Sequence, residues 1–372
     1  IFGQVVILVL IQIGGLGVIT ILSSVMILLH KRMGIGNRLL LQDAFNLNSL
    51  SGIVRFVKKV MLGTFLVEGI GALLYMTVFV PEFGLKGIWI SGIDIIGENS
   101  LCDYATNPMI NTVTGLLIIL SGIGYIVWWD VLRVLKKART KKVRCFRDLT
   151  LHSKIAITAT LILIFMGAAF IFAFEYNNPQ TMGDYNLLQK IEVSLFQSVT
   201  TRTAGFATVP QENLTNASAI VCLLLMFIGG SPVGTAGGIK TVTFAVIIVA
   251  AIASIRNKED TEVFGRQLTK QAVSKAVAVT CMSFIIMFAS TVLLSAVTDA
   301  NALDIVYETV SATATVGLTR NLTSALNVWG KIIIIITMYL GRVGPISLAL
   351  ALNFKKKQNN IIKNPTEVIS VG

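Results

Sequence analysis

The sequence predicts an all-α, polytopic membrane protein in which helix–pore-loop–helix repeats surround one pore with pseudo-fourfold symmetry. Of its 372 residues, 54% are hydrophobic and 13% are charged, whereas a soluble domain has about 25% charged residues. Apolar stretches interrupted by glycine recur about every 110 residues. Two further apolar stretches are too short to cross a bilayer and end in polar turns. Together these observations indicate repeated units packed around a common axis.

Basic residues set the expected orientation. Most of the 31 Lys and Arg lie in blocks at 31–59, 133–154, 256–275 and 355–363. These blocks alternate with segments poor in basic residues, which is typical of cytoplasmic loops, so we expect the C-terminus to be cytoplasmic. The net charge of +12 then favours contact with the lipid bilayer or an acidic cytosolic partner, and no nucleic acid.

Apolar runs and their breaks predict the elements in order. A span needs about 20 residues, so we expect spans at 1–29, 59–80, 109–129, 155–174, 219–255, 275–297 and 330–352. Residues 38–48 form an amphipathic interfacial segment, 81–108 an external loop, and 130–154 and 257–274 cytoplasmic linkers. The stretches 186–199 and 303–312 become half-helices that enter the membrane and stop. Since the chain opens as IFGQVVILVL without Met, we expect residues to precede Ile1.

The spacing of glycines divides the chain into repeats. Gly15, Gly122, Gly229 and Gly341 mark breaks in inward spans, and the turn glycines Gly205 and Gly317 lie 112 residues apart. This places the inner helix of a first repeat and its linker in 1–50. Repeat 2, with a truncated pore helix, takes 51–150, repeat 3 takes 151–274, and repeat 4 with the C-terminal tail takes 275–372.

Each half-helix ends in a turn of small residues that suits a cation filter. A ring of backbone carbonyls can replace the hydration shell of an alkali cation, provided that side chains point away from the axis. The candidate residues are Arg202, Thr203, Ala204, Gly205 and Phe206 in one turn, and Ala314, Thr315, Val316, Gly317 and Leu318 in the other. The similar word TVTGL at 112–116 has no half-helix before it, so we interpret it as helix.

Residues 227–244, FIGGSPVGTAGGIKTVTF, interrupt an otherwise apolar span. Glycine and proline disfavour helix there, and irregular backbone at membrane depth is tolerated only inside protein or beside water. We therefore expect this segment to line an aqueous path, the alternative being a kinked helix within a bundle. Lys240 and Arg342 are intramembrane charges. Arg342 could raise a barrier to cations or form a structural ion pair, and Lys240 could act likewise or anchor the broken helix.

The chain resembles the membrane subunit of the Ktr/Trk/HKT superfamily of potassium transporters, most closely its KtrB type. The resemblance rests on QIGGLG at 12–17, FQSVTTRTAGF at 196–206, GGSPVGTAGGIK at 229–240, TATVGL at 313–318 and GRVGP at 341–345. It implies K+ uptake across a bacterial plasma membrane, with Na+ coupling in some members. It also implies a homodimer on a cytosolic ring of nucleotide-binding regulatory subunits of the KtrA/TrkA type, with nucleotide held only by that partner.

The resemblance also implies a gating loop below the filter. Its residues here are Gly229, Gly230, Ser231, Pro232, Gly234, Thr235, Ala236, Gly237, Gly238 and Lys240, with Arg342 narrowing the same place. The chain departs from the family pattern in two respects. The first repeat starts at its inner helix, and the second offers the turn glycine Gly92 only eleven residues after Pro81. Either the sequence is partial or this is a degenerate copy.

Three functions compete at this point. The first is potassium uptake through the carbonyl filter. The second is a non-conducting membrane partner that docks a cytosolic regulatory ring. An enzyme is not expected, because HExxH and GxSxG are missing and GTAGGIKT does not fit the phosphate-loop spacing. The four cysteines are widely spaced and the two histidines isolated, so no metal site is expected.

Overall fold

The computed structural model describes residues 53–84, 86–87, 100–138, 145–258 and 260–343, together with the single positions 3, 6, 10 and 14. Those four positions are helical. Several predictions lie outside the described residues: most of the first span, the interfacial segment 38–48, the turn glycine Gly92, and the basic tail with Gly344 and Pro345.

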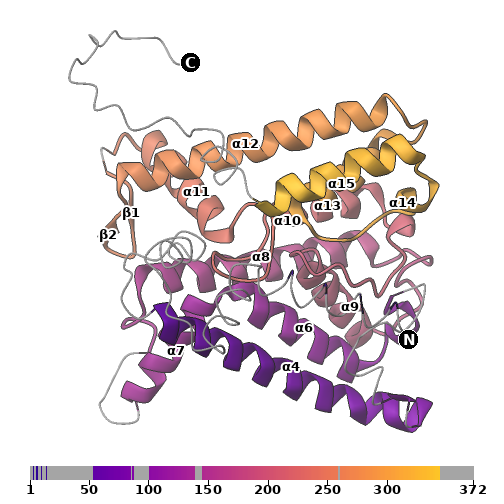
Figure 1. Ribbon diagram of the computed structural model, residues 1–372, viewed down its shortest axis with the longest axis horizontal. Coiled ribbons are helices and arrows are strands. Elements are labelled where there is room, and N and C mark those ends of the chain that lie inside the picture. Colours follow the sequence, from indigo (N-terminus) through magenta and orange to yellow (C-terminus); the bar gives the residue numbers. More distant parts are fainter. Residues whose placement is uncertain are drawn as a thin grey trace.

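The described chain is almost entirely helical (Figure 1). Its helices are α4 (Ile53–Phe83), α6 (Pro108–Ile123), α7 (Tyr125–Ala138), α8 (Leu151–Glu175), α9 (Leu187–Thr200), α10 (Asn216–Phe227), α11 (Thr241–Ile255), α12 (Lys270–Ser295), α13 (Ala302–Ala314), α14 (Leu322–Ala325) and α15 (Val328–Val343), with short 3₁₀ turns η1 (Cys102–Tyr104) and η2 (Gln211–Asn213). Within these ranges the only strands are β1 (Glu262–Val263) and β2 (Arg266–Gln267).

In the part of the chain that the structure describes, three helices are long and apolar enough to cross a bilayer: Val57–Phe83 within α4, α8 and α12. The consecutive helices α6 and α7 pass the same test as a pair but are bent by 96°. Large apolar side chains are exposed along the long helices, among them Phe65, Phe165 and Phe288, as expected where a helix faces lipid. The prediction of an all-helical, multi-pass membrane protein is therefore confirmed.

Two segments of the chain repeat one order of elements. In each, a long helix is followed by a short one, a turn and a further helix: α8, α9 and α10 in the first, α12, α13 and α15 in the second. The short helices begin at Asn186, whose side chain and Gln189 form a capping box, and at Asn301. Both half-helices therefore agree with the sequence within two residues at each end.

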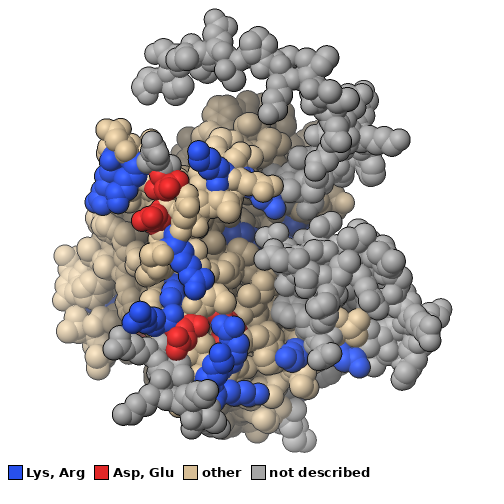
Figure 2. Space-filling model, turned by 90° about the vertical axis from the view of Figure 1, so that its left-hand side faces the viewer, with Lys and Arg blue, Asp and Glu red and all other residues tan. Residues whose placement is uncertain are grey.

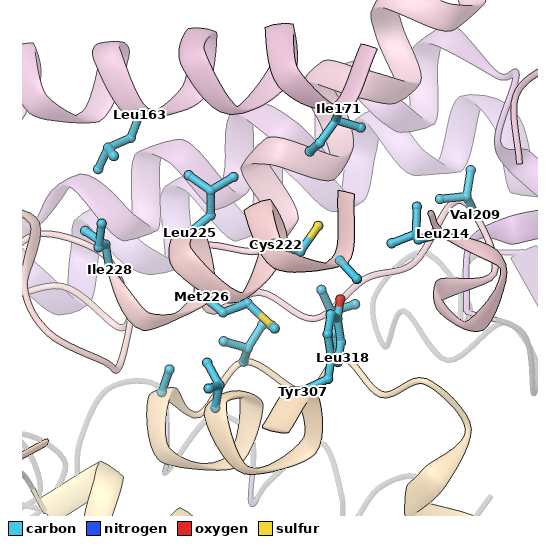
Figure 3. Packing of buried hydrophobic residues seen from close by; sticks show 14 of the residues in the cluster. Leu163, Ile171, Val209, Leu214, Cys222, Leu225, Met226, Ile228, Tyr307 and Leu318 are labelled. Carbon is cyan, nitrogen blue, oxygen red and sulfur yellow. The ribbon is translucent and has the colours of Figure 1, made fainter. Parts of the chain in front are cut away.

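A buried apolar cluster holds the two segments together (Figure 3). Leu163 and Ile171 of α8, Leu225 and Met226 of α10, and Tyr307 of α13 belong to it. The helices approach closely beside Gly167, where an added Cβ would lie 2.5 Å from Ser198 Oγ and 2.6 Å from Leu225 Cδ1. This packing fixes where the half-helices α9 and α13 end, and hence where their turns lie.

Several boundaries differ from the sequence prediction; for example, the spans expected from 59 and 275 begin at Ile53 and Lys270. The span expected to leave at Pro81 continues to Phe83, so Pro81 lies inside its last turn. The span expected over 109–129 ends at Ile123, and the linker expected from Asp130 is helical to Ala138. The break expected at Gly341 is not present before Val343. There glycine provides space instead, since an added Cβ would lie 2.1 Å from Thr313 O.

The expected charged linker 257–274 contains an unpredicted hairpin. Val263 pairs with Arg266, and both residues between them, Phe264 and Gly265, have positive φ. This is the backbone of a tight two-residue hairpin turn. The sequence signal was weak, because phenylalanine is seldom found in this conformation.

Candidate functional site: two turns over a glycine-rich loop

The turns after α9 and α13 have the same backbone. Thr203 and Gly205 have φ values of +64° and +83°, and Thr315 and Gly317 have values of +53° and +99°. In both turns the left-handed residues are therefore two apart, a threonine and then a glycine. Left-handed φ costs threonine energy, so its presence twice at the same place marks a constrained turn.

The two turns lie against each other. A Cβ added to Gly205 would lie 2.3 Å from Val316 O and 3.3 Å from the Cα of Gly317, and one added to Gly317 would lie 3.8 Å from the Cα of Gly205. A backbone carbonyl of one turn thus faces the glycine of the other. The structure brings together two segments that are 112 residues apart in the chain.

Hydrogen bonds hold each turn to its half-helix. Thr200 Oγ1 donates to Phe206 O at 2.6 Å, and Gly317 N donates to Ser311 Oγ at 3.1 Å. Four of the turn side chains lie in apolar clusters: Ala204 and Phe206 pack near Ile164 and Val199, and Val316 and Leu318 are buried. The backbone of these turns is therefore left to define the surface between them.

The Arg202 side chain binds neighbouring helices. Arg202 is 6% exposed, and its Nη2 donates to Thr160 Oγ1 at 3.3 Å and to Thr241 Oγ1 at 2.9 Å. Thr241 in turn donates to Gly229 O at 2.8 Å. Arg202 thus ties its turn to α8 and to the start of α11.

The predicted break in the 219–255 span lies directly against both turns. Helix stops at Phe227 and resumes at Thr241. A Cβ on Gly237 would lie 2.0 Å from Thr315 Oγ1 and 2.5 Å from Ala314 O. Gly237 N also donates to Thr203 Oγ1 at 3.2 Å. The intervening residues 228–240, here called the glycine-rich loop, therefore contact both turns through positions where only glycine fits.

The loop closes on itself between its two ends. Ile228 and Ile239 form a parallel bridge. A Cβ on Gly229 would lie 2.1 Å from Gly237 O, and Gly238 has φ +63° with its Cβ position 3.3 Å from Ala314 Cβ. At these ends Ile239 N donates to Phe227 O at 3.2 Å and Thr241 N donates to Gly230 O at 3.0 Å, so part of this irregular backbone is hydrogen-bonded inside protein, as membrane depth demands.

The far side of the loop docks on the bend between α6 and α7. Ser231 N donates to Gly122 O at 2.8 Å, and Tyr125 N donates to Val233 O at 3.0 Å. At the bend, Gly124 has φ +91°, and a Cβ there would lie 2.4 Å from Pro232 O. Gly234 and Gly230 also lie within contact of this bend. The sequence predicts the break at Gly122, whereas the bend lies at Gly124. Two glycines separated by a single residue at the end of an apolar run are a signal from which Gly124 could have been found.

Both predicted intramembrane cations bind carbonyl groups of the loop. Lys240 Nζ donates to Ala236 O at 2.5 Å and contacts Gly237 O at 3.5 Å. Arg342 Nη1 donates to Thr235 O at 2.8 Å, and its Nη2 donates to Gly14 O. A hydrogen bond to a charged donor is stronger than one between neutral groups. Within the described chain, Lys240 and Arg342 therefore hold the glycine-rich loop in place through hydrogen bonds to its backbone, and these two contacts form a latch.

Known proteins resemble the chain along its length. Residues 2–364 match the TrkH family, described as a cation transport protein. The chain is 37% identical to the "Ktr system potassium uptake protein B" of Bacillus subtilis (strain 168), covering 100% of this chain and 84% of that protein. It is 33% identical to the "Potassium/sodium uptake protein NtpJ" of Enterococcus hirae, covering 100% and 83%.

A solved structure confirms the architecture. The potassium transporter TrkH from Vibrio parahaemolyticus superposes with a TM-score of 0.68 over 85% of this chain and 68% of that one, at 14% identity. This likeness shows the fold, while the family match and the full-length relatives show descent. The chain belongs to the TrkH family of cation transport proteins and is not an enzyme.

Proposed function

We propose that the chain is the ion-translocating subunit of a Ktr/Trk-type potassium uptake system in a bacterial plasma membrane. The observation that carries the proposal is the face-to-face approach of the turns at Gly205 and Gly317, with the glycine-rich loop directly against them. The names of the potassium and potassium/sodium uptake relatives support the ion.

In this proposal the carbonyls of the two turns, at 202–206 and 314–318, coordinate K+ in place of water. The apolar turn side chains lie in buried clusters, and Thr203, Thr315 and Arg202 face the glycine-rich loop or neighbouring helices, which supports backbone oxygens as the groups offered to an ion. Gly92 and a first-repeat turn would complete a four-sided site around a pseudo-fourfold axis. Sodium enters either as a second transported ion or as a coupling ion.

The glycine-rich loop is then the gate. It lies against both turns and is latched by two cations, so a cation leaving the turns toward the cytoplasm would meet backbone and fixed positive charge. Opening requires the loop to leave Thr203 and Thr315 and to release carbonyls held by Lys240 and Arg342. In this scheme the charges both hold the closed loop and raise the electrostatic barrier.

A basic end of the molecule suits a regulatory partner. Figure 2 shows Lys and Arg gathered on the face formed by α7 and the hairpin, with fewer acidic residues between them. Exposed members include Lys136, Arg147, Arg256, Arg266 and Lys270. We propose that this end and the C-terminus are cytoplasmic, and that a homodimer docks there on a nucleotide-binding ring.

Growth and flux together test the proposal. The full-length gene should restore growth of an uptake-deficient bacterium at low K+, and the purified protein should carry K+ into liposomes. A protein that binds the regulatory ring but carries neither K+ nor Na+ would instead establish the non-conducting partner.

A further inference from the structure

A buried polar network joins the two half-helices above their turns. Gln197 of α9 and Gln211 of η2 pair their amides, with Gln197 Nε2 donating to Gln211 Oε1 at 2.7 Å and Gln211 Nε2 donating to Gln197 Oε1 at 3.2 Å. Tyr307 of α13 donates its hydroxyl to the same Gln211 Oε1 at 3.0 Å. Their exposed fractions are 0%, 3% and 0%. Gln211 therefore contacts side chains from both half-helices.

Arg320 makes a second connection at the same place. It lies three residues after Gly317, yet its Nη1 donates to Gln211 O at 3.0 Å and its Nη2 donates to Glu212 O at 3.2 Å, both beyond the other turn. Its Nε donates to Asp304 Oδ1 of α13 at 2.7 Å. One guanidinium thus spans the half-helix of one segment and the backbone of the other.

The two turns are about 110 residues apart in the sequence, so the chain itself does not fix the distance between them. Packing of apolar side chains does not define a distance as narrowly as directed hydrogen bonds do. Ion recognition by carbonyls needs the coordinating groups held within a fraction of an ångström. The polar network supplies such directed contacts between the two segments.

We propose that Tyr307, Gln211 and Arg320 are positioning residues that fix the separation of the two carbonyl turns and thereby set the preference for K+ over Na+. This inference rests on the proposed function, because it takes the turns at Gly205 and Gly317 as the filter. None of the three needs to touch the ion. Loosening the network should let the carbonyl site contract around Na+, the smaller cation. The preference for K+ over Na+ should therefore weaken while the maximal flux stays near that of the wild type.

Tyr307→Phe is the sharpest variant, because it keeps the ring that packs in the apolar cluster (Figure 3) and removes only the hydroxyl. Tyr104→Phe is its matched control. That hydroxyl donates to Glu82 Oε1 at 2.9 Å in an exposed position and takes no part in the buried network. Arg320→Lys provides an independent test, since lysine keeps the charge next to Asp304 but not the planar set of donors that reaches four acceptors.

The experiment measures initial fluxes of K+ and of Na+ into liposomes containing the full-length protein, over a range of each ion. For Tyr307→Phe we expect the concentration giving half-maximal K+ flux to rise about three- to tenfold, the size expected for one buried hydrogen bond. The Na+ concentration that gives half-maximal flux should stay level or fall, and the maximal flux of either ion should change little. Arg320→Lys should shift the ratio of the K+ and Na+ half-maximal concentrations in the same direction, and Tyr104→Phe should leave that ratio unchanged.

Two results distinguish a failure of the proposed function from a failure of the positioning role. If the wild-type protein carries neither ion, the proposed function fails. If it transports and both variants keep the wild-type ratio of the two half-maximal concentrations, the positioning role alone is overturned. A common loss of affinity for both ions, or a lower thermal transition with an unchanged ratio, overturns it as well, because a purely structural role gives that result.

Discussion

Replacing Gly237 with alanine should open the proposed gate. The added Cβ would lie 2.0 Å from Thr315 Oγ1 and 2.5 Å from Ala314 O, far inside van der Waals contact, and one of the two obstacles is backbone. Overpacking of this kind costs about 1–3 kcal/mol. Because the clash exists only while the loop lies against the turns, this cost falls on the closed state.

The size of the effect follows from the population of the two states. A closed state raised by about 1.4 kcal/mol loses a factor of about ten relative to the open one. We therefore expect K+ flux without the regulatory partner to rise about five- to a hundredfold in liposomes containing Gly237→Ala. Gly115→Ala is the control, because a Cβ at that helical position meets nothing within 4 Å. Unchanged flux through a folded Gly237→Ala protein, or equal effects of both variants, would refute this reasoning.

The remaining predictions test the latch, the bend and the topology. Arg342→Gln should raise basal flux about tenfold, since a charge-assisted hydrogen bond to Thr235 O is lost; a lower flux would show that Arg342 acts otherwise. Gly124→Ala should destabilise the protein by about 2 kcal/mol or more, through its positive φ and its 2.4 Å approach to Pro232 O, measured as a fall in thermal transition; an unchanged transition would contradict the docking of the loop on this bend. Burial, then the charges of Asp103 and Glu212, raise the pKa of Cys102 to about 11, so alkylation of Cys102 should quicken about tenfold per pH unit from pH 8 to 10 as the thiolate forms. An impermeant reagent should reach Cys102 from outside and the exposed Cys145 from inside; labelling of both from one side would overturn the proposed orientation.

The half-helices and the broken span could be predicted because their signals are local. Apolar length alone distinguishes 186–199 and 303–312 from full spans, and five glycines with Pro232 between 229 and 238 interrupt a helix wherever they occur. The adjacency of Gly205 and Gly317 was predicted from repeat spacing, which is a property of the sequence, and the structure brings them together.

Other features depend on contacts that no local pattern specifies. The bend at Gly124 is set by a loop more than one hundred residues later, which donates and accepts hydrogen bonds there. The Arg202 side chain binds threonines on α8 and α11, and the local sequence TTRTAGF does not specify these partners. Likewise, the sequence predicts a break at Gly341, whose close contact with Thr313 O is apparent only when α13 and α15 are packed together.

Lys240 and Arg342 stand at membrane depth while holding the loop, so they also lie within the voltage that falls across the bilayer. Each elementary charge moved through 100 mV changes the energy by about 2.3 kcal/mol. In the proposed orientation, a negative cell interior would draw both side chains toward the cytoplasm. If the loop is the gate, the resting potential would then bias how often the pathway conducts, before any nucleotide or regulatory protein acts.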